Sequence, residues 1–235
     1  MTDKGLGRRD FLKTAVAGGA AAATTGTAIL PETAAAQPAA PSAPGYAFLN
    51  TDESAFVEAL VDHMIPADEL TPKGTDIGLA VYIDRALASA WGKGDRLYMQ
   101  GPWKLGAPSQ GYQLPLTPAQ LYRAGIEATN AHCVKTYGKS FDKLTEAQRE
   151  EVLIGLSRGT IAFTNGLPVR DFWTAVYQNV MEGMFSDPIY GGNRNKASWR
   201  MLGFPGLPAI YADKIDEYRD KRYVVAEPQS IADFS

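Results

Sequence analysis

Histidine and cysteine, two residues that often perform acid–base, nucleophilic or metal chemistry, are scarce in this 235-residue chain, which has two histidines and one cysteine. The histidines are His63 and His132, and the cysteine is Cys133. A catalytic zinc site usually takes three protein ligands, and neighbours such as His132 and Cys133 point in different directions on a helix. We therefore expect His63 to be structural and Cys133 to be a small buried apolar residue.

Sequence motifs for cofactors, nucleotides and covalent catalysis are also missing. The chain has no C-x-x-C-H for attached haem, no G-x-G-x-x-G, no phosphate-binding loop and no G-x-S-x-G. Asp62 and Asp84 could be buried, but the sequence indicates no partner for either carboxylate. We expect no catalytic residue, bound cofactor or metal ligand on this chain.

The charge balance argues against nucleic acid as a partner. The whole chain carries 23 basic and 26 acidic residues. Nucleic-acid-binding proteins concentrate positive charge on one surface, which a slightly acidic chain does not favour. A single cysteine cannot form an internal disulfide, which fits folding in a reducing compartment.

The first 36 residues are typical of a twin-arginine (Tat) export signal. They have a basic start, a mildly apolar stretch rich in Ala, Gly and Thr, and a small-residue A-x-A cleavage site. The stretch is too short and too weakly apolar to hold a helix in a membrane. An ordinary secretory signal or a retained anchor remains the alternative. The signal residues are Arg8, Arg9, Phe11, Leu12 and Lys13, with cleavage at Ala34 and Ala36.

The remaining chain is predicted to be a linker followed by one compact all-α domain. Residues 37–48 are rich in Pro and Ala and indicate a linker, and residues 49–235 form the domain. Capping signals and helical spacing predict five helices. They begin at Asn50 or Thr51, Thr75 or Asp76, Thr117, Thr145 and Pro168, and end near Pro66, Gly92, Tyr137, Gly159 and Phe185.

Two stretches of the domain are predicted to be irregular. Residues 92–116 are rich in Gly and Pro, and a loop of this length in a compact domain is usually functional. From residue 187 the chain is mostly loop, with short helical turns expected near 196–202 and 209–218. No alternation typical of β-strands is visible.

The 187–206 segment combines Gly and Pro turns with large side chains. Aromatic and Arg residues dominate the binding energy of many protein interfaces. This pattern predicts a recognition surface with Tyr190, Arg194, Trp199 and Phe204 as its anchors. The alternative is a loop that packs back on its own helices.

The chain resembles a known family, the small (gamma) subunit of membrane-bound flavin-dependent sugar and sugar-acid dehydrogenases, also called gluconate 2-dehydrogenase subunit 3. The resemblance spans most of the chain after the signal, and the stretch from Gly183 is its most specific part. It is carried by the twin-arginine start and by residues 49–53 with Ile65-Pro66, 76–84, 183–193, Trp199 and 203–206.

The resemblance implies a complex of three subunits at the periplasmic face of the inner membrane. An FAD-containing large subunit would oxidise the substrate, and a multihaem cytochrome c subunit would pass the electrons on. The small subunit would be non-catalytic and free of cofactor, and would touch the membrane only through the complex. It would meet the Tat translocase during export, supply the signal that the large subunit lacks, and support that subunit's maturation and stability.

A stand-alone exported enzyme or binding protein with an unrecognised site is the alternative function. The reading frames beside the gene for this chain would distinguish the two hypotheses. A large flavoprotein without its own signal, encoded beside a c-type cytochrome, favours the small-subunit hypothesis. The sequence leaves the oxidised sugar, polyol or sugar acid open, because that chemistry would reside on another chain.

Overall fold

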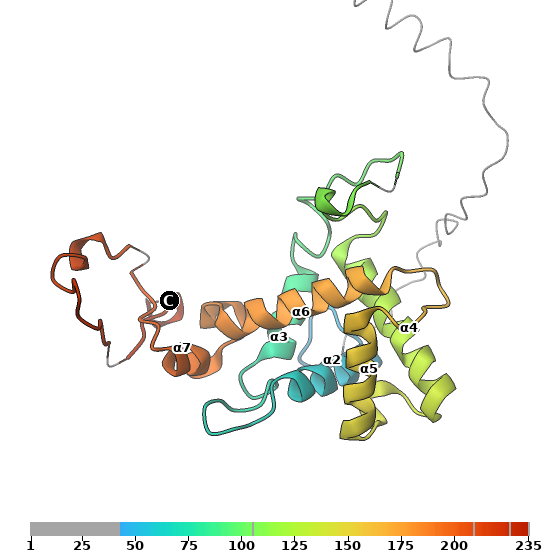
Figure 1. Cartoon of the computed structure of the whole chain (residues 1–235), viewed down its shortest axis with the longest axis horizontal. Helices are drawn as coiled ribbons and strands as arrows, with labels where there is room; N and C mark the ends of the chain where they lie inside the picture. Colours follow the sequence, from blue (N-terminus) through green and yellow to red (C-terminus); the bar gives the residue numbers. More distant parts are fainter. Residues whose placement is uncertain (1–42, 105, 209, 226, 235) are drawn as a thin grey trace, which may run out of the picture. The chain divides into compact units, whose positions relative to one another are not determined.

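The computed structural model describes residues 43–234 except 105, 209 and 226. The predicted export-signal residues Arg8, Arg9, Phe11, Leu12, Lys13, Ala34 and Ala36 lie outside the described residues. Figure 1 shows the described residues, which belong to one compact unit.

The described residues form six α-helices and several short 3₁₀ turns. No strand occurs among them, and one isolated β-bridge joins Gly206 to Gln229. The predicted all-α class is therefore confirmed. The α-helices are α2 (Thr51–Met64), α3 (Leu79–Ala88), α4 (Pro118–Tyr137), α5 (Glu146–Arg158), α6 (Val169–Phe185) and α7 (Ala197–Leu202). The 3₁₀ turns are η1 (Pro108–Gln110), η2 (Phe141–Lys143), η3 (Pro188–Tyr190), η4 (Arg194–Lys196), η5 (Ala212–Lys214) and η6 (Ile231–Phe234).

Three predicted capping boxes start three of these helices. At α2 the Asn50 side chain accepts from the Glu53 N–H at 2.9 Å, and the Glu53 carboxylate accepts from the Asn50 N–H at 3.0 Å. Thr117 with Gln120 starts α4 in the same way, and Thr145 with Gln148 starts α5. Each box satisfies two backbone donors that a helix start leaves unpaired, which is why the sequence signal was reliable.

The prediction for α3 was wrong at both ends. α3 begins at Leu79, because residues 74–78 form a series of turns that ends at Gly78, whose φ of 87° lies in the left-handed region and cannot continue a helix. α3 ends at Ala88, where the Ser89 hydroxyl donates to the Ala86 carbonyl. Local side-chain bonds of this kind compete with helical hydrogen bonds and shorten a helix.

Helix α6 is the centre of the domain, and it packs against α3, α4 and α5 (Figure 1). Two glycines allow this close packing. A Cβ on Gly125 of α4 would lie 2.1 Å from the Phe172 ring of α6, and a Cβ on Gly183 of α6 would lie 2.9 Å from the Tyr82 ring of α3. The core includes Phe56, Leu60, Ile83, Leu121, Tyr122, Phe141, Leu156, Phe172, Val176 and Val180.

Residues 43–49 are attached to the helical domain, although residues up to 48 were expected to form a linker. The buried Asp84 carboxylate of α3 accepts hydrogen bonds from three consecutive backbone N–H groups. The donors are Ala47 at 2.7 Å, Phe48 at 2.8 Å and Leu49 at 2.9 Å. Asp84, for which the sequence indicated no partner, therefore holds residues 47–49 against α3.

Candidate partner interface

The 187–206 segment begins with a tight turn whose glycines face other backbone. Asp187 starts η3, where its carboxylate accepts from the Ile189 N–H at 3.0 Å. A Cβ on Gly192 would lie only 2.1 Å from the Gly183 carbonyl oxygen, and a Cβ on Gly78 would lie 2.2 Å from the Gly191 carbonyl oxygen. The turn thus passes between α6 and the start of α3, where only glycines fit.

Asn193 fixes the path of the chain after this turn. Its side chain is fully buried, donates to the Ser186 carbonyl at 3.0 Å and accepts from the Ser198 N–H at 3.0 Å. It therefore links the end of α6 to the start of α7. Asn193 has a φ of 46°, in the left-handed region that Asn tolerates better than most residues. The next residue, Arg194, donates its backbone N–H to the Ile77 carbonyl at 3.0 Å.

The four predicted anchors occupy different environments. Tyr190 and Phe204 are 57% and 43% exposed, and Arg194 is also exposed. Trp199 is only 6% exposed; its indole N–H donates to the Phe185 carbonyl at 2.8 Å, and its ring packs edge-on against Phe204. The structure places Trp199 inside the segment, so it acts here as internal packing. Tyr190, Arg194 and Phe204 remain predicted contact residues.

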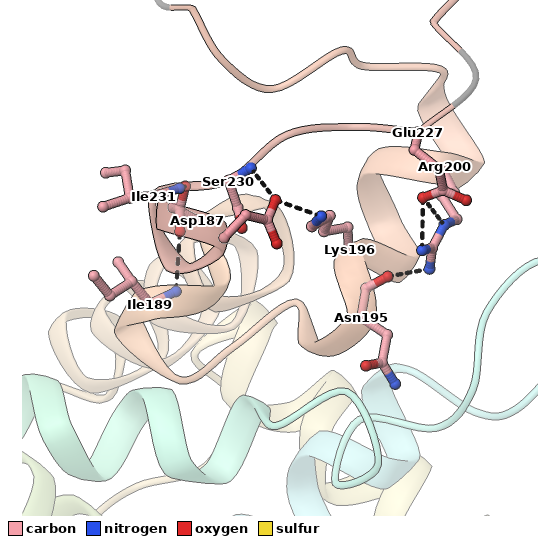
Figure 2. Close-up of polar contacts among 9 residues, drawn as sticks. Asp187, Ile189, Asn195, Lys196, Arg200, Glu227, Ser230 and Ile231 are labelled. Carbon is pink, nitrogen blue, oxygen red and sulfur yellow. Dashed lines mark hydrogen bonds and ion pairs between the residues drawn. The ribbon is translucent and has the colours of Figure 1, made fainter. Parts of the chain in front are cut away.

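The end of the chain returns to this segment, which the sequence analysis did not foresee. The second Asp187 oxygen accepts from the Ile231 N–H at 2.8 Å, Lys196 pairs with Asp233 at 2.6 Å, and Arg200 pairs with Glu227 at 2.9 Å (Figure 2). Arg200 also donates to the Asn195 carbonyl. The contacts of residues 227–233 with the segment join residues 27 to 44 positions apart, so no local pattern predicts them.

An open groove of about 830 Å³ lies beside the same turn. Its lining includes Tyr82 and Arg85 from α3, Glu182 and Phe185 from α6, and Tyr190 from η3. The Tyr82 hydroxyl donates to the Glu182 carboxylate at 3.3 Å. Burial, together with the nearby Glu182 carboxylate, raises the pKa of Tyr82 to about 12. The tyrosine is therefore neutral and a hydrogen-bond donor at physiological pH.

The residues considered for catalysis in the sequence lie outside the lining of this groove. Cys133 is buried, and burial raises the pKa of its thiol to about 11, so the reactive thiolate is scarce near neutral pH. His63 lies 2.7 Å from the Glu150 carboxylate, and Asp62 pairs with Lys73 at 2.9 Å. In the described part of the chain, no three His, Cys, Asp or Glu side chains are grouped to hold a metal ion. Nor does any helix described there have the length and apolar character needed to cross a membrane.

Comparison with known proteins places this architecture in a family. The family model described as gluconate 2-dehydrogenase subunit 3 matches residues 51–206, from the start of α2 to the end of the glycine-rich segment. No curated protein and no solved structure shows a significant match. The family is that of a small subunit of a dehydrogenase complex. Because the match covers well over half of the 235 residues, the chain belongs to the gluconate 2-dehydrogenase subunit 3 family.

Proposed function

We propose that this chain is the non-catalytic small subunit of a periplasmic, flavin-dependent dehydrogenase complex of the gluconate type. It provides Tat export, maturation and stability for the large subunit that carries FAD. A multihaem cytochrome c subunit completes the complex and receives the electrons. The observation that carries the proposal is the family match over residues 51–206, which covers the α2–α7 core of the described domain.

The order of segments along the chain supports the export part of the proposal. The predicted signal and the linker precede a helical domain with a single core, and Asp84 fastens the start of that domain at residues 47–49. Tat carries folded proteins, so a subunit with this order can export a folded partner that lacks a signal. The exposed surface beside Tyr190 offers such a partner a place to bind.

Replacement of Arg8 and Arg9 by Lys tests this function. The double variant keeps the charge but loses the planar guanidinium groups. We expect both this chain and the large flavin subunit to remain in the cytoplasm, as measured by fractionation and by dehydrogenase activity in the periplasm. Lys4→Arg is the matched control within the same basic region and should export both proteins normally. Unchanged periplasmic dehydrogenase activity in the double variant would refute the escort role.

A further inference from the structure

Two neighbouring hollows follow one face of α6. The 830 Å³ groove takes Asn179 and Glu182 from α6 and Ser186 directly after it, and a second hollow of about 470 Å³ takes Asp171, Thr174, Ala175 and Gln178 from α6. These positions recur every three or four residues, so they share one face of the helix. Trp91 lines both hollows. The stripe from Asp171 to Ser186 is about 22 Å long at 1.5 Å per residue.

The walls of this long groove are apolar and partly exposed. Ile189 is 38% exposed and Trp91 37% exposed, and Tyr190 continues the surface. Contiguous apolar patches on a folded domain commonly mark a protein-binding surface. A groove about four helical turns long is also much longer than a small ligand requires.

Two opposite charges, Glu182 and Arg85, line the 830 Å³ part of the groove without a countercharge. Glu182 accepts hydrogen bonds from the neutral side chains of Tyr82, Gln178 and Asn179, and the Arg85 guanidinium donates to the Ile189 carbonyl. Within the described residues, neither Glu182 nor Arg85 lies within ion-pair distance of an opposite charge. A partner that carries one basic and one acidic side chain beside an apolar stripe complements this arrangement.

We propose that this groove binds an amphipathic helix of the dehydrogenase large subunit. The apolar stripe of that helix packs against Trp91, Ile189 and Tyr190, a basic residue pairs with Glu182, and an acidic residue pairs with Arg85. A helix is favoured over an extended strand because α6 forms one wall over about four turns and the described residues offer no sheet edge to extend. This inference rests on the proposed function, because it names the surface that the large subunit occupies.

The test is recovery of the full chain with a tagged FAD-containing large subunit produced in the same cells. Ile189→Arg places a charge on the apolar wall of the groove. Ile154→Arg on α5 is the matched control, because Ile154 is also 38% exposed and does not line either hollow. We expect Ile189→Arg to lower recovery about tenfold or more, as loss of an interface anchor does, and Ile154→Arg to leave recovery unchanged.

The charges are tested with neutral variants of similar shape. Glu182→Gln and Arg85→Gln should each weaken recovery about fivefold at low salt, and added salt should reduce the difference from wild type. The melting temperature of each variant shows whether a loss of recovery comes from unfolding of the chain.

The outcomes separate the groove from the function. Failure of the wild-type chain to be recovered with the large subunit overturns the proposed function and this inference together. Recovery of wild type and Ile189→Arg at equal levels overturns only the groove. If the wild-type chain forms a dimer and Ile189→Arg dissociates it, the groove binds a second copy of this chain. That outcome also overturns the inference.

Discussion

The carboxylate of Asp84 on α3 accepts a hydrogen bond from the backbone N–H of Leu49 at 2.9 Å, at a site where both residues are buried. Two further N–H groups, from Ala47 and Phe48, donate to the same carboxylate. Three donors converge on one ionised group, and hydrogen bonds to charged groups are stronger than neutral ones. This contact joins the start of the folded domain to its core.

Asp84→Asn should therefore destabilise the domain. The amide retains one oxygen acceptor but turns an NH₂ group toward backbone donors, which leaves buried N–H groups unpaired. We expect a loss of about 2–4 kcal/mol in unfolding free energy, or a melting temperature lower by roughly 5–10 °C for a domain of this size. Urea denaturation of the purified variant measures it. Asp76→Asn, an exposed position on the preceding turn, should change stability by less than about 0.5 kcal/mol.

Asn193 permits a second test, which separates its hydrogen bonds from its backbone conformation. Asn193→Gly keeps the freedom to adopt a φ of 46° but loses the contacts with Ser186 and Ser198. Asn193→Ala loses the same contacts and also disfavours that φ. We expect both variants to be destabilised by about 2–4 kcal/mol in thermal or urea unfolding, with Ala worse than Gly by about 1 kcal/mol. Equal stability of Ala and wild type would contradict the role assigned to Asn193.

The Asp62–Lys73 pair predicts a dependence of stability on acid pH. Burial acts to raise the pKa of Asp62, but hydrogen bonds from the Lys73 ammonium and from Thr75 outweigh it and hold the pKa below its usual value. Because the folded-state pKa is the lower one, the carboxylate stabilises the fold above the pKa of the unfolded chain. That stability is lost as pH falls through the folded-state pKa.

Asp62→Asn should thus lower stability near neutral pH and flatten the decline of stability as pH falls below the ordinary pKa of Asp, about 4. Urea unfolding at several pH values compares this variant with wild type. Asp76→Asn serves again as the control, and it should follow the wild-type profile. A decline as steep in Asp62→Asn as in wild type would assign the acid sensitivity to other carboxylates.

The sequence predicted those parts of the fold whose causes are local. The three capping boxes and the glycine after α4 involve residues within four positions of each other, so the pattern itself carries the physics. The predicted start of α3 was wrong because Gly78 takes a left-handed φ of 87°, on a turn held by the distant Arg194 N–H, which donates to the Ile77 carbonyl. The partners of Asp84 are backbone groups 35 to 37 residues away, which no side-chain pattern reveals.

The candidate site was predictable to a similar degree. Gly and Pro marked the turn at residues 187–206, and the large side chains marked it as a place for packing or recognition. Which of them face outward depends on the end of α6, because the Phe185 carbonyl takes the Trp199 N–H and so turns that ring inward. The groove joins Tyr82 to Glu182, residues 100 positions apart, and only the packing of α3 on α6 brings them together.

Alanine variants of Trp199, Phe204 and Tyr190 should divide into two classes. Trp199→Ala removes a buried ring and its hydrogen bond, and we expect it to cost about 3–5 kcal/mol and to lower the melting temperature of the isolated subunit. Phe204→Ala removes one edge-on aromatic contact with Trp199, worth about 0.5–1.5 kcal/mol. Tyr190→Ala should change stability by less than about 0.5 kcal/mol, because the side chain is largely exposed.

Recovery with the large subunit should distinguish Tyr190→Ala from the Trp199 variants. Because Tyr190 lines the groove, Tyr190→Ala should weaken recovery about tenfold while the isolated subunit stays folded. Trp199→Phe keeps most of the buried apolar surface and, if Trp199 acts only through packing, should restore recovery along with most of the lost stability. Normal recovery of Tyr190→Ala would remove this residue from the interface. An unchanged melting temperature for Trp199→Ala would instead show that the ring does not hold the segment together. Because melting temperature and recovery are measured on the same variants, a role in folding and a role in binding are told apart.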